Sequence, residues 1–428
     1  MVSLDDLRGD TAVLALDQWL ESMRGPSGYT GPISHWWDSS LIYTGAMLDW
    51  RYEGILCGYL NLYHATSNAI WLRRAQQAGD DLIAGQQTDG HFWNSSFEFG
   101  PAIGGTPHEA AATIGLLELA SVLRAEKLAE WQRYFAAAEQ TIRQVLIGRL
   151  WTGRGFREQP DDDCLVANKN ATTLEALLLY EALSGESMQL YITAAAQVVL
   201  SCQVAEGSRA GATVHAGTHQ HALTFGIYTA RCVSAIARLI GRQPLPMYAA
   251  FIQKAVRYLS TLVQADGTLL GHYKSGPLIG APRWISPSGD LLRAFLLAQP
   301  YATFDQTLIA KLVSILVNAQ YPGGGIPTAN GFARLGRLKF RETLPEFRDV
   351  LPVVGWCDKA FRALTMLYQP HYINVTTSFQ KTEIDCVWRN RRCWFREDKT
   401  RFMLTEQRSG HLYYEWHKGE SYPDVIDL

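Results

Sequence analysis

The chain has 428 residues, of which 47% are hydrophobic and 19% are charged, and its formal net charge is -2. This composition can bury a large core and excludes an intrinsically disordered chain. The balanced charge and the lack of a basic run or an RNA-binding motif argue against a nucleic-acid partner. No apolar stretch approaches the roughly 18 to 20 residues that a membrane span needs.

The N-terminal stretch MVSLDDLRGDTAVLALDQWLESM lacks the basic-then-apolar order of a signal peptide and predicts an amphipathic helix. The seven cysteines are scattered without zinc-type pairs, which suits free thiols in a reducing compartment. We therefore expect a cytoplasmic protein.

Helical periodicity with start and stop signals predicts twelve helices. Short connections alternate with long ones, so the helices pair into six hairpins with all long loops at one end. The helices are expected at residues 4–24, 50–66, 69–87, 106–124, 127–149, 170–184, 187–205, 219–241, 246–264, 287–299, 303–320 and 353–369.

The two helices of each hairpin differ in composition. The odd-numbered helices are amphipathic and suit an outer layer, whereas the even-numbered ones are apolar all round and must be surrounded by protein. An all-α fold follows, an (α/α)6 toroid of six helical hairpins over residues 1–369, with a large helical bundle as the alternative. The two layers predict the exposure of individual side chains. On the inner helices we expect buried Leu116, Leu178, Phe225 and Leu292, and on the outer helices exposed Arg73, Arg133 and Lys311.

After Tyr368 the pattern changes to short runs of β-branched and aromatic residues bounded by polar turns. Residues 370–428 are therefore expected to form a second unit, a small antiparallel β appendage. Cys386 and Cys393 flank a predicted hairpin turn in it, and we interpret them as buried thiols rather than a disulfide.

In the expected toroid, the long loops end where the inner helices start, so those starts converge on one funnel. Five of them carry a carboxylate: Glu53, Glu109, Glu175, Asp290 and Asp358. Carboxylates also stabilise the first turn of a helix, which is the alternative role for each of them. Several carboxylates in one partly dry funnel would raise the pKa of at least one, as acid–base chemistry requires.

Three histidines lie within seven residues, at His215, His219 and His221. They could bind a metal, serve catalysis or substrate binding, or brace the loop. Zinc needs three or four converging ligands, and no nearby cysteine or carboxylate completes the set, so we expect no metal and no cofactor.

The six-hairpin pattern resembles the (α/α)6 toroid superfamily of carbohydrate-active enzymes, which includes unsaturated glucuronyl hydrolases, glucosamine epimerases and, with a C-terminal β domain, polysaccharide lyases. The resemblance is architectural and covers about residues 1–369. It implies a glycoside hydrolase, or a uronic-acid lyase or epimerase, acting on a small molecule or oligosaccharide. The candidate catalytic residues are Glu53, Glu109, Asp358, His108, His219 and His221, and the candidate substrate-binding residues are Trp36, Trp37, Asp38, Arg51, His91, Trp93, Lys169, His215, Tyr273, Asp290 and Trp356.

A second similarity is to terpene cyclases, which carry Q-x-x-x-G-x-W turns that Gln86, Gly90 and Phe92 approximate. Their acidic D-x-D-D motif is not matched, because Pro160 stands at its first position. An isoprenoid cyclase and a non-catalytic glycan-binding toroid are therefore the alternative functions. A polar funnel lined by carboxylates would favour sugars, and a deep aromatic cavity would favour isoprenoids.

Overall fold

The structure, a computed structural model, describes residues 9–34, 41–44, 48–92, 108–215, 224–270, 272–273, 278–279, 281–332, 344–369 and 379–420. Its helices are α1 Gly9–Ser22, α2 Arg51–Thr66, α3 Ala69–Gly85, α4 His108–Ala125, α5 Trp131–Gln140, the π-helix η2 Thr141–Leu150, α6 Ala167–Ser184, α7 Gln189–Ser201, α8 Gly226–Arg242, α9 Pro246–Leu262, α10 Ser288–Ala298, α11 Thr307–Asn318, α12 Phe347–Val350 and α13 Val354–Thr365. Short paired strands lie between them: β1 Arg24–Gly25, β2 Gly28–Tyr29, β3 Gly31–Ser34, β4 Leu41–Thr44, β5 Thr224–Phe225, β6 His272–Tyr273, β7 Leu278–Ile279, β8 Arg283–Trp284 and β9 Ala329–Asn330.

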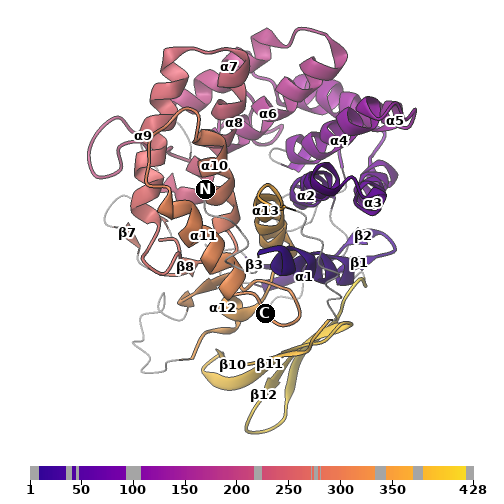
Figure 1. Cartoon of the computed structure of the whole chain (residues 1–428), viewed down its shortest axis with the longest axis vertical. Helices are drawn as coiled ribbons and strands as arrows, with labels where there is room; N and C mark the ends of the chain where they lie inside the picture. Colours follow the sequence, from indigo (N-terminus) through magenta and orange to yellow (C-terminus); the bar gives the residue numbers. More distant parts are fainter. Residues whose placement is uncertain are drawn as a thin grey trace.

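Six helices form an inner ring in which each packs on the next along the chain (Figure 1). The order is α2, α4, α6, α8, α10 and α13, and the ring closes because α13 packs against α2. Outside it, α3, α5, α7, α9 and α11 each pack on the inner helix that precedes them, and α1 packs on α13. No helix in the described part of the chain is both long and apolar enough to cross a membrane.

The predicted hairpins are confirmed, with three local corrections. The helix expected at 219–241 begins only at Gly226, because Thr224 and Phe225 are extended and pair with β6. The helix expected at 127–149 divides into α5 and the wider η2. The long connection before α13 contains an unexpected short helix, α12, whose start is fixed by a capping box between Glu346 and Asp349.

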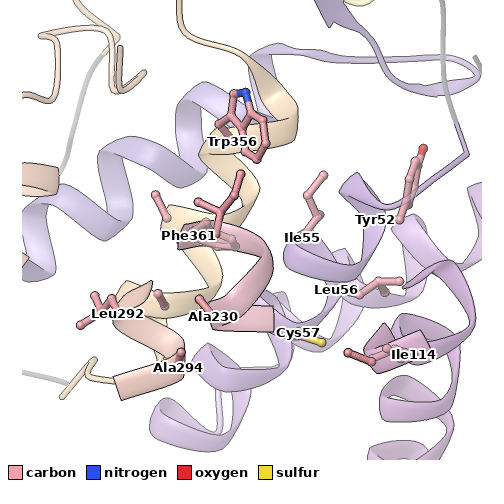
Figure 2. Close-up of a cluster of buried hydrophobic side chains, with 14 of the residues drawn as sticks. Tyr52, Ile55, Leu56, Cys57, Ile114, Ala230, Leu292, Ala294, Trp356 and Phe361 are labelled. Carbon is pink, nitrogen blue, oxygen red and sulfur yellow. The ribbon is translucent and has the colours of Figure 1, made fainter. Parts of the chain in front are cut away.

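Side chains of the inner helices form much of the hydrophobic core. Figure 2 shows side chains of α2, α4, α8, α10 and α13 gathered in one apolar cluster. The expected burial of Leu116, Leu178, Phe225 and Leu292 is confirmed, and Arg73 and Arg133 are exposed as expected. Lys311 is instead half-buried, because the turn at Gly267 packs against its backbone.

A repeated glutamine joins neighbouring outer helices. After α3, α7 and α11, the side-chain amides of Gln86, Gln203 and Gln320 donate to a glycine carbonyl of their own turn, at 3.3, 3.3 and 2.8 Å. The same amides donate to backbone carbonyls of the next outer helix, namely Ala137 of α5, Phe251 of α9 and Ala12 of α1. The third contact joins the last outer helix to the first.

The C-terminal strands form an antiparallel sheet in chain order, β10 Thr382–Trp388, β11 Arg391–Glu397, β12 Arg401–Glu406 and β13 Leu412–His417. Its apolar face packs on Phe347 of α12, and buried Glu397 accepts hydrogen bonds from Trp19 of α1 and from Lys418. Cys386 and Cys393 lie opposite each other as buried free thiols, as expected. The division into two domains at residue 370 stays a prediction.

Ring closure provides a first test. A Cβ atom at Gly58 of α2 would lie 2.4 Å from Cδ1 of Phe361 in α13, so Gly58→Ala must push the two helices apart. We expect it to lower the free energy of unfolding by about 1 to 3 kcal/mol in urea denaturation. At the control Gly241 in α8, the nearest atom is 3.6 Å away, so Gly241→Ala should be neutral or stabilise by up to about 1 kcal/mol. Equal effects would contradict direct packing of α13 on α2.

Candidate active site

Charged side chains from all six inner helices meet on the ring axis. We call the following set the axial charge network: Glu53, Glu118, Glu175, Arg231, Arg238, Arg293 and Arg362. Arg231 links two of its carboxylates, with Nη1 2.7 Å from Glu53 and Nη2 2.9 Å from Glu175. Glu53 also accepts a hydrogen bond from Arg362, and Glu175 accepts one from Arg293 at 2.8 Å.

The paired arginines keep these carboxylates ionised. Burial alone would raise the pKa of Glu53, but Arg231 and Arg362 outweigh it and hold that pKa well below its ordinary value. Arg231 and Arg293 lower the pKa of buried Glu175 in the same way. A carboxylate fixed in its charged form cannot donate a proton near neutral pH. Glu53, an expected catalytic residue, therefore has the environment of a structural anion.

A second acidic pair lies at the ring mouth, the end of the ring where the inner helices start. Asp358 of α13 is fully buried, and its Oδ2 atom accepts a hydrogen bond from Lys359 at 2.5 Å. Its Oδ1 atom has no hydrogen-bond partner in the described structure. Burial raises the pKa of Asp358 to about 8 against the attraction of Lys359, and Asp290 and Glu53 raise it further. Burial also raises the pKa of half-buried Asp290 in α10.

Three tryptophan rings cluster next to Lys359, the partner of Asp358. The ring of Trp356 lies 5.5 Å from that of Trp50 and 6.4 Å from that of Trp284. The ammonium of Lys359 lies 4.8 Å from the centre of the Trp50 ring and donates a hydrogen bond to the Trp50 carbonyl oxygen at 3.0 Å. The ring mouth therefore combines a neutral carboxyl group, a cation and flat apolar surfaces.

The first and second inner helices meet at a buried polar contact. Two nitrogen atoms of Arg51 donate to both oxygens of Asp49, at 2.8 and 2.5 Å. Nδ1 of His108, at the start of α4, lies 4.0 Å from Asp49. The structure thus brings the predicted residues Arg51 and His108 together through a carboxylate that the sequence did not single out.

Glu109, an expected catalytic residue, holds a turn. Its Oε2 atom accepts a hydrogen bond from the backbone amide of Phe92 at 3.0 Å. In the next two hairpins, Asn170 accepts from the amide of Phe156 at 2.8 Å and Thr229 from that of Thr213 at 3.0 Å. Since three inner helices use different side chains for this contact, it needs an acceptor rather than an acid.

His215 and Lys169 lie together at the starts of α6 and α8. The His215 ring lies 5.5 Å from that of Tyr228, and its carbonyl accepts a hydrogen bond from the Ala167 amide at 3.1 Å. Burial and the Lys169 charge lower the pKa of His215 to about 4, so its imidazole is neutral at physiological pH. Lys169 itself forms an ion pair with Glu158.

Other predicted residues lie in the turn after α3 or outside the described residues. His91 pairs with Asp89 in the turn after α3, and Arg149 also binds Asp89 at 2.8 Å. Among the described residues, no group of three or more His, Cys, Asp or Glu side chains could hold a metal ion. Trp36, Trp37, Asp38, Trp93, His219 and His221 lie outside the described residues, as does the side chain of Tyr273.

Several residues that are central in the structure were not predicted from the sequence. Arg231, Arg293 and Arg362 occur in helices that are otherwise almost wholly buried. A buried arginine needs an anionic partner, so each was a detectable signal of an internal ion pair. Trp50 and Lys359 carried no comparable signal, because tryptophans and lysines at helix starts are common in many roles.

Comparison with solved structures supports the fold. No protein-family model matches the chain, and no curated protein sequence matches it. A possible member of the GH105 family from Klebsiella pneumoniae superposes with a TM-score of 0.60 at 12% identity, covering 86% of this chain and 93% of that chain. A D-mannose isomerase superposes with a TM-score of 0.60 at 13% identity, covering 84% and 96%.

A cellobiose 2-epimerase from Bacillus thermoamylovorans has a TM-score of 0.59 at 12% identity and covers 83% of this chain and 99% of its own. These solved proteins all belong to the (α/α)6 toroid superfamily, so the predicted resemblance is confirmed. At such low identity the likeness concerns the fold alone.

The axial charge network provides a second test. Glu175→Gln keeps the side-chain size but leaves Arg293 without its carboxylate and Arg231 with Glu53 alone. Because breaking a buried ion pair leaves an uncompensated charge, we expect a loss of about 3 to 5 kcal/mol in the free energy of unfolding. Glu186→Gln, which removes the exposed partner of Arg143, is the control and should cost about 1 kcal/mol or less. Similar losses would mean that the network contributes no more than a surface pair.

Proposed function

We propose that this protein is a carbohydrate-active enzyme of the (α/α)6 toroid type that hydrolyses glycosides, with Asp358 as the proton donor. One observation carries the proposal: a buried carboxyl group with a free oxygen and a pKa of about 8 lies at the ring mouth beside tryptophan rings. Such a group is protonated at neutral pH and can donate that proton to a glycosidic oxygen. Flat indole faces suit the apolar faces of a sugar ring.

Glycoside hydrolysis needs a second carboxylate, and Asp290 is the best candidate. It is less buried than Asp358, and the two carboxyl groups interact electrostatically. Asp290 would act as the base that activates water or as the nucleophile that attacks the sugar. Lys359, bonded to Asp358, would hold the acid in position and balance the charge of the pair.

The other candidates fit less well. Glu53 is held ionised by two arginines, and Glu109 holds the Phe92 amide. A uronic-acid lyase would need a free cation beside its base, but among the described candidates Arg51 is paired with Asp49 and Lys169 with Glu158. Catalytic roles for His108, His219 and His221 stay predictions.

The axis of the ring also argues against the isoprenoid alternative. A cyclase would need a deep apolar cavity lined by aromatic faces. Here the described part of the axis carries ion pairs close to Asp358, such as Glu53 with Arg231. Ion pairs close to the carboxyl groups of Asp358 and Asp290 favour a polar substrate that carries hydroxyl groups.

The proton-donor role predicts a dependence on the leaving group. With Asp358→Asn, hydrolysis of alkyl glycosides, which need protonation of the departing oxygen, should fall by about 100- to 10,000-fold in kcat/KM. Hydrolysis of 4-nitrophenyl glycosides, whose leaving group departs as a stable anion, should fall much less. Glu118→Gln, at the far end of the axial charge network, is the control and should affect both substrates equally. Equal losses in Asp358→Asn would exclude this residue as the acid.

The raised pKa predicts the pH dependence. Asp358 is protonated below pH 8 in the folded protein, so kcat/KM should fall about tenfold per pH unit above about pH 8, and this limb should be absent in Asp358→Asn. Between about pH 4 and 8 the folded state holds a proton that the unfolded state releases, so the stability that this group contributes should decline as the pH rises. Denaturation at several pH values should show a smaller decline in Asp358→Asn, and an unchanged slope would contradict the raised pKa.

A further inference from the structure

Buried oxygen atoms without partners recur at the starts of three consecutive inner helices. They are Oδ1 of Asn168, the second residue of α6, Oγ1 of Thr224 just before α8 and Oγ of Ser286 just before α10. All three residues are buried, and none of these atoms has a hydrogen-bond partner in the described structure. A buried polar atom left unpaired costs roughly 1 to 3 kcal/mol, so such a recurrence requires an explanation.

The three residues occupy one position of the repeated hairpin. Each stands seven residues before a member of the axial charge network, namely Glu175, Arg231 or Arg293. Seven residues are about two turns of a helix, so Asn168 lies on the same face of α6 as Glu175 and therefore faces the ring axis. Thr224 and Ser286 precede the first residue of their helices and hold the corresponding place in the chain.

The next inner helix, α13, continues this series of unpaired oxygen atoms. Asp358 stands four residues before Arg362 in α13, on the same helix face, and its Oδ1 atom is also buried and unpaired. Gly289 of α10 packs directly on Lys359 of α13, which brings the starts of these two helices together. The unpaired oxygens therefore follow the ring mouth from α6 through α8 and α10 to the proposed acid.

The chemical character of these side chains indicates which kind of ligand they can bind. Amide and hydroxyl side chains carry no charge and both donate and accept hydrogen bonds, as the hydroxyl groups of a sugar do. The cations nearby face acidic groups, since Lys169 pairs with Glu158, Arg293 pairs with Glu175, and Lys359 interacts electrostatically with Asp290 as well as bonding Asp358. These side chains can therefore bind hydroxyl groups. Among the described residues, no unpaired cation lies beside them to bind a carboxylate or phosphate group.

We infer that Asn168, Thr224 and Ser286 form the binding site for the hydroxyl groups of an uncharged sugar ring. This inference rests on the proposed function, because it places that ring next to Asp358. It goes further by naming the substrate class as a neutral glycoside rather than a uronic acid or a sugar phosphate. It also identifies three specificity-determining residues that the sequence pattern alone did not indicate.

Direct binding tests the inference separately from catalysis. Isothermal titration calorimetry on Asp358→Asn protein would use methyl mannoside, methyl glucoside, cellobiose and glucuronate as probes. We expect at least one neutral sugar to bind more tightly than glucuronate. Asn168→Ala, Thr224→Val and Ser286→Ala, each added to this background, should weaken that binding about tenfold per substitution.

A stability readout distinguishes binding from a structural role. Removing an oxygen that has no partner in the free protein removes a desolvation cost, so the Tm of Thr224→Val and Ser286→Ala should stay the same or rise. Thr113→Val in α4 is the matched control, because its hydroxyl is also buried and unpaired among the described residues but does not occupy this position. It should leave sugar binding unchanged.

The failures of the two proposals can be told apart. Tighter binding of glucuronate, binding of no neutral sugar, or unchanged affinity in all three variants would overturn the inference while leaving the leaving-group test of Asp358 intact. Full turnover by Asp358→Asn together with weaker sugar binding in the three variants would instead overturn the role of Asp358 and support the hydroxyl site.

Discussion

The structure depends on the charges that meet on its axis. A ring of six helices leaves a central line that each helix faces, and here every inner helix supplies at least one ionised side chain to it. Because a buried charge without a partner is far more costly than a paired one, the network fixes the rotation and the height of each helix relative to the others. The network therefore also orients residues at the ring mouth, since Asp358 lies on the same face of α13 as Arg362, and Asn168 lies on the same face of α6 as Glu175.

The network also separates two kinds of carboxylate that look alike in the sequence. Glu53 and Asp358 both occur near the start of an inner helix, yet two guanidinium groups hold the first ionised, whereas burial beside other acids keeps the second protonated. One fold therefore keeps one buried carboxyl group charged and another protonated, and only the second suits the proposed proton donation. The difference lies in how many cations each group contacts, not in its depth below the surface.

The hairpins could be predicted from the sequence because helical periodicity and turn residues are local signals. Even so, local signals misplaced the start of α8, where pairing of Thr224–Phe225 with a distant strand overrides helix propensity. The candidate site was harder, because Arg231 and Arg362 reach Glu53 across 178 and 309 positions in the sequence. No periodic pattern specifies such partners, so the sequence could not show that Glu53 pairs with arginines on the axis or that Glu109 holds a turn.

Closure of the ring by α13 has a consequence for synthesis of the protein in the cell. The face of α2 that carries Gly54 and Gly58 fits only against α13, which follows about 300 residues later. At about 5 to 20 residues per second, a ribosome needs roughly 15 to 60 s to deliver that partner. During this interval the first hairpins expose apolar surface and part of the ion-pair network, so the nascent chain is most prone to aggregation before its last helix emerges.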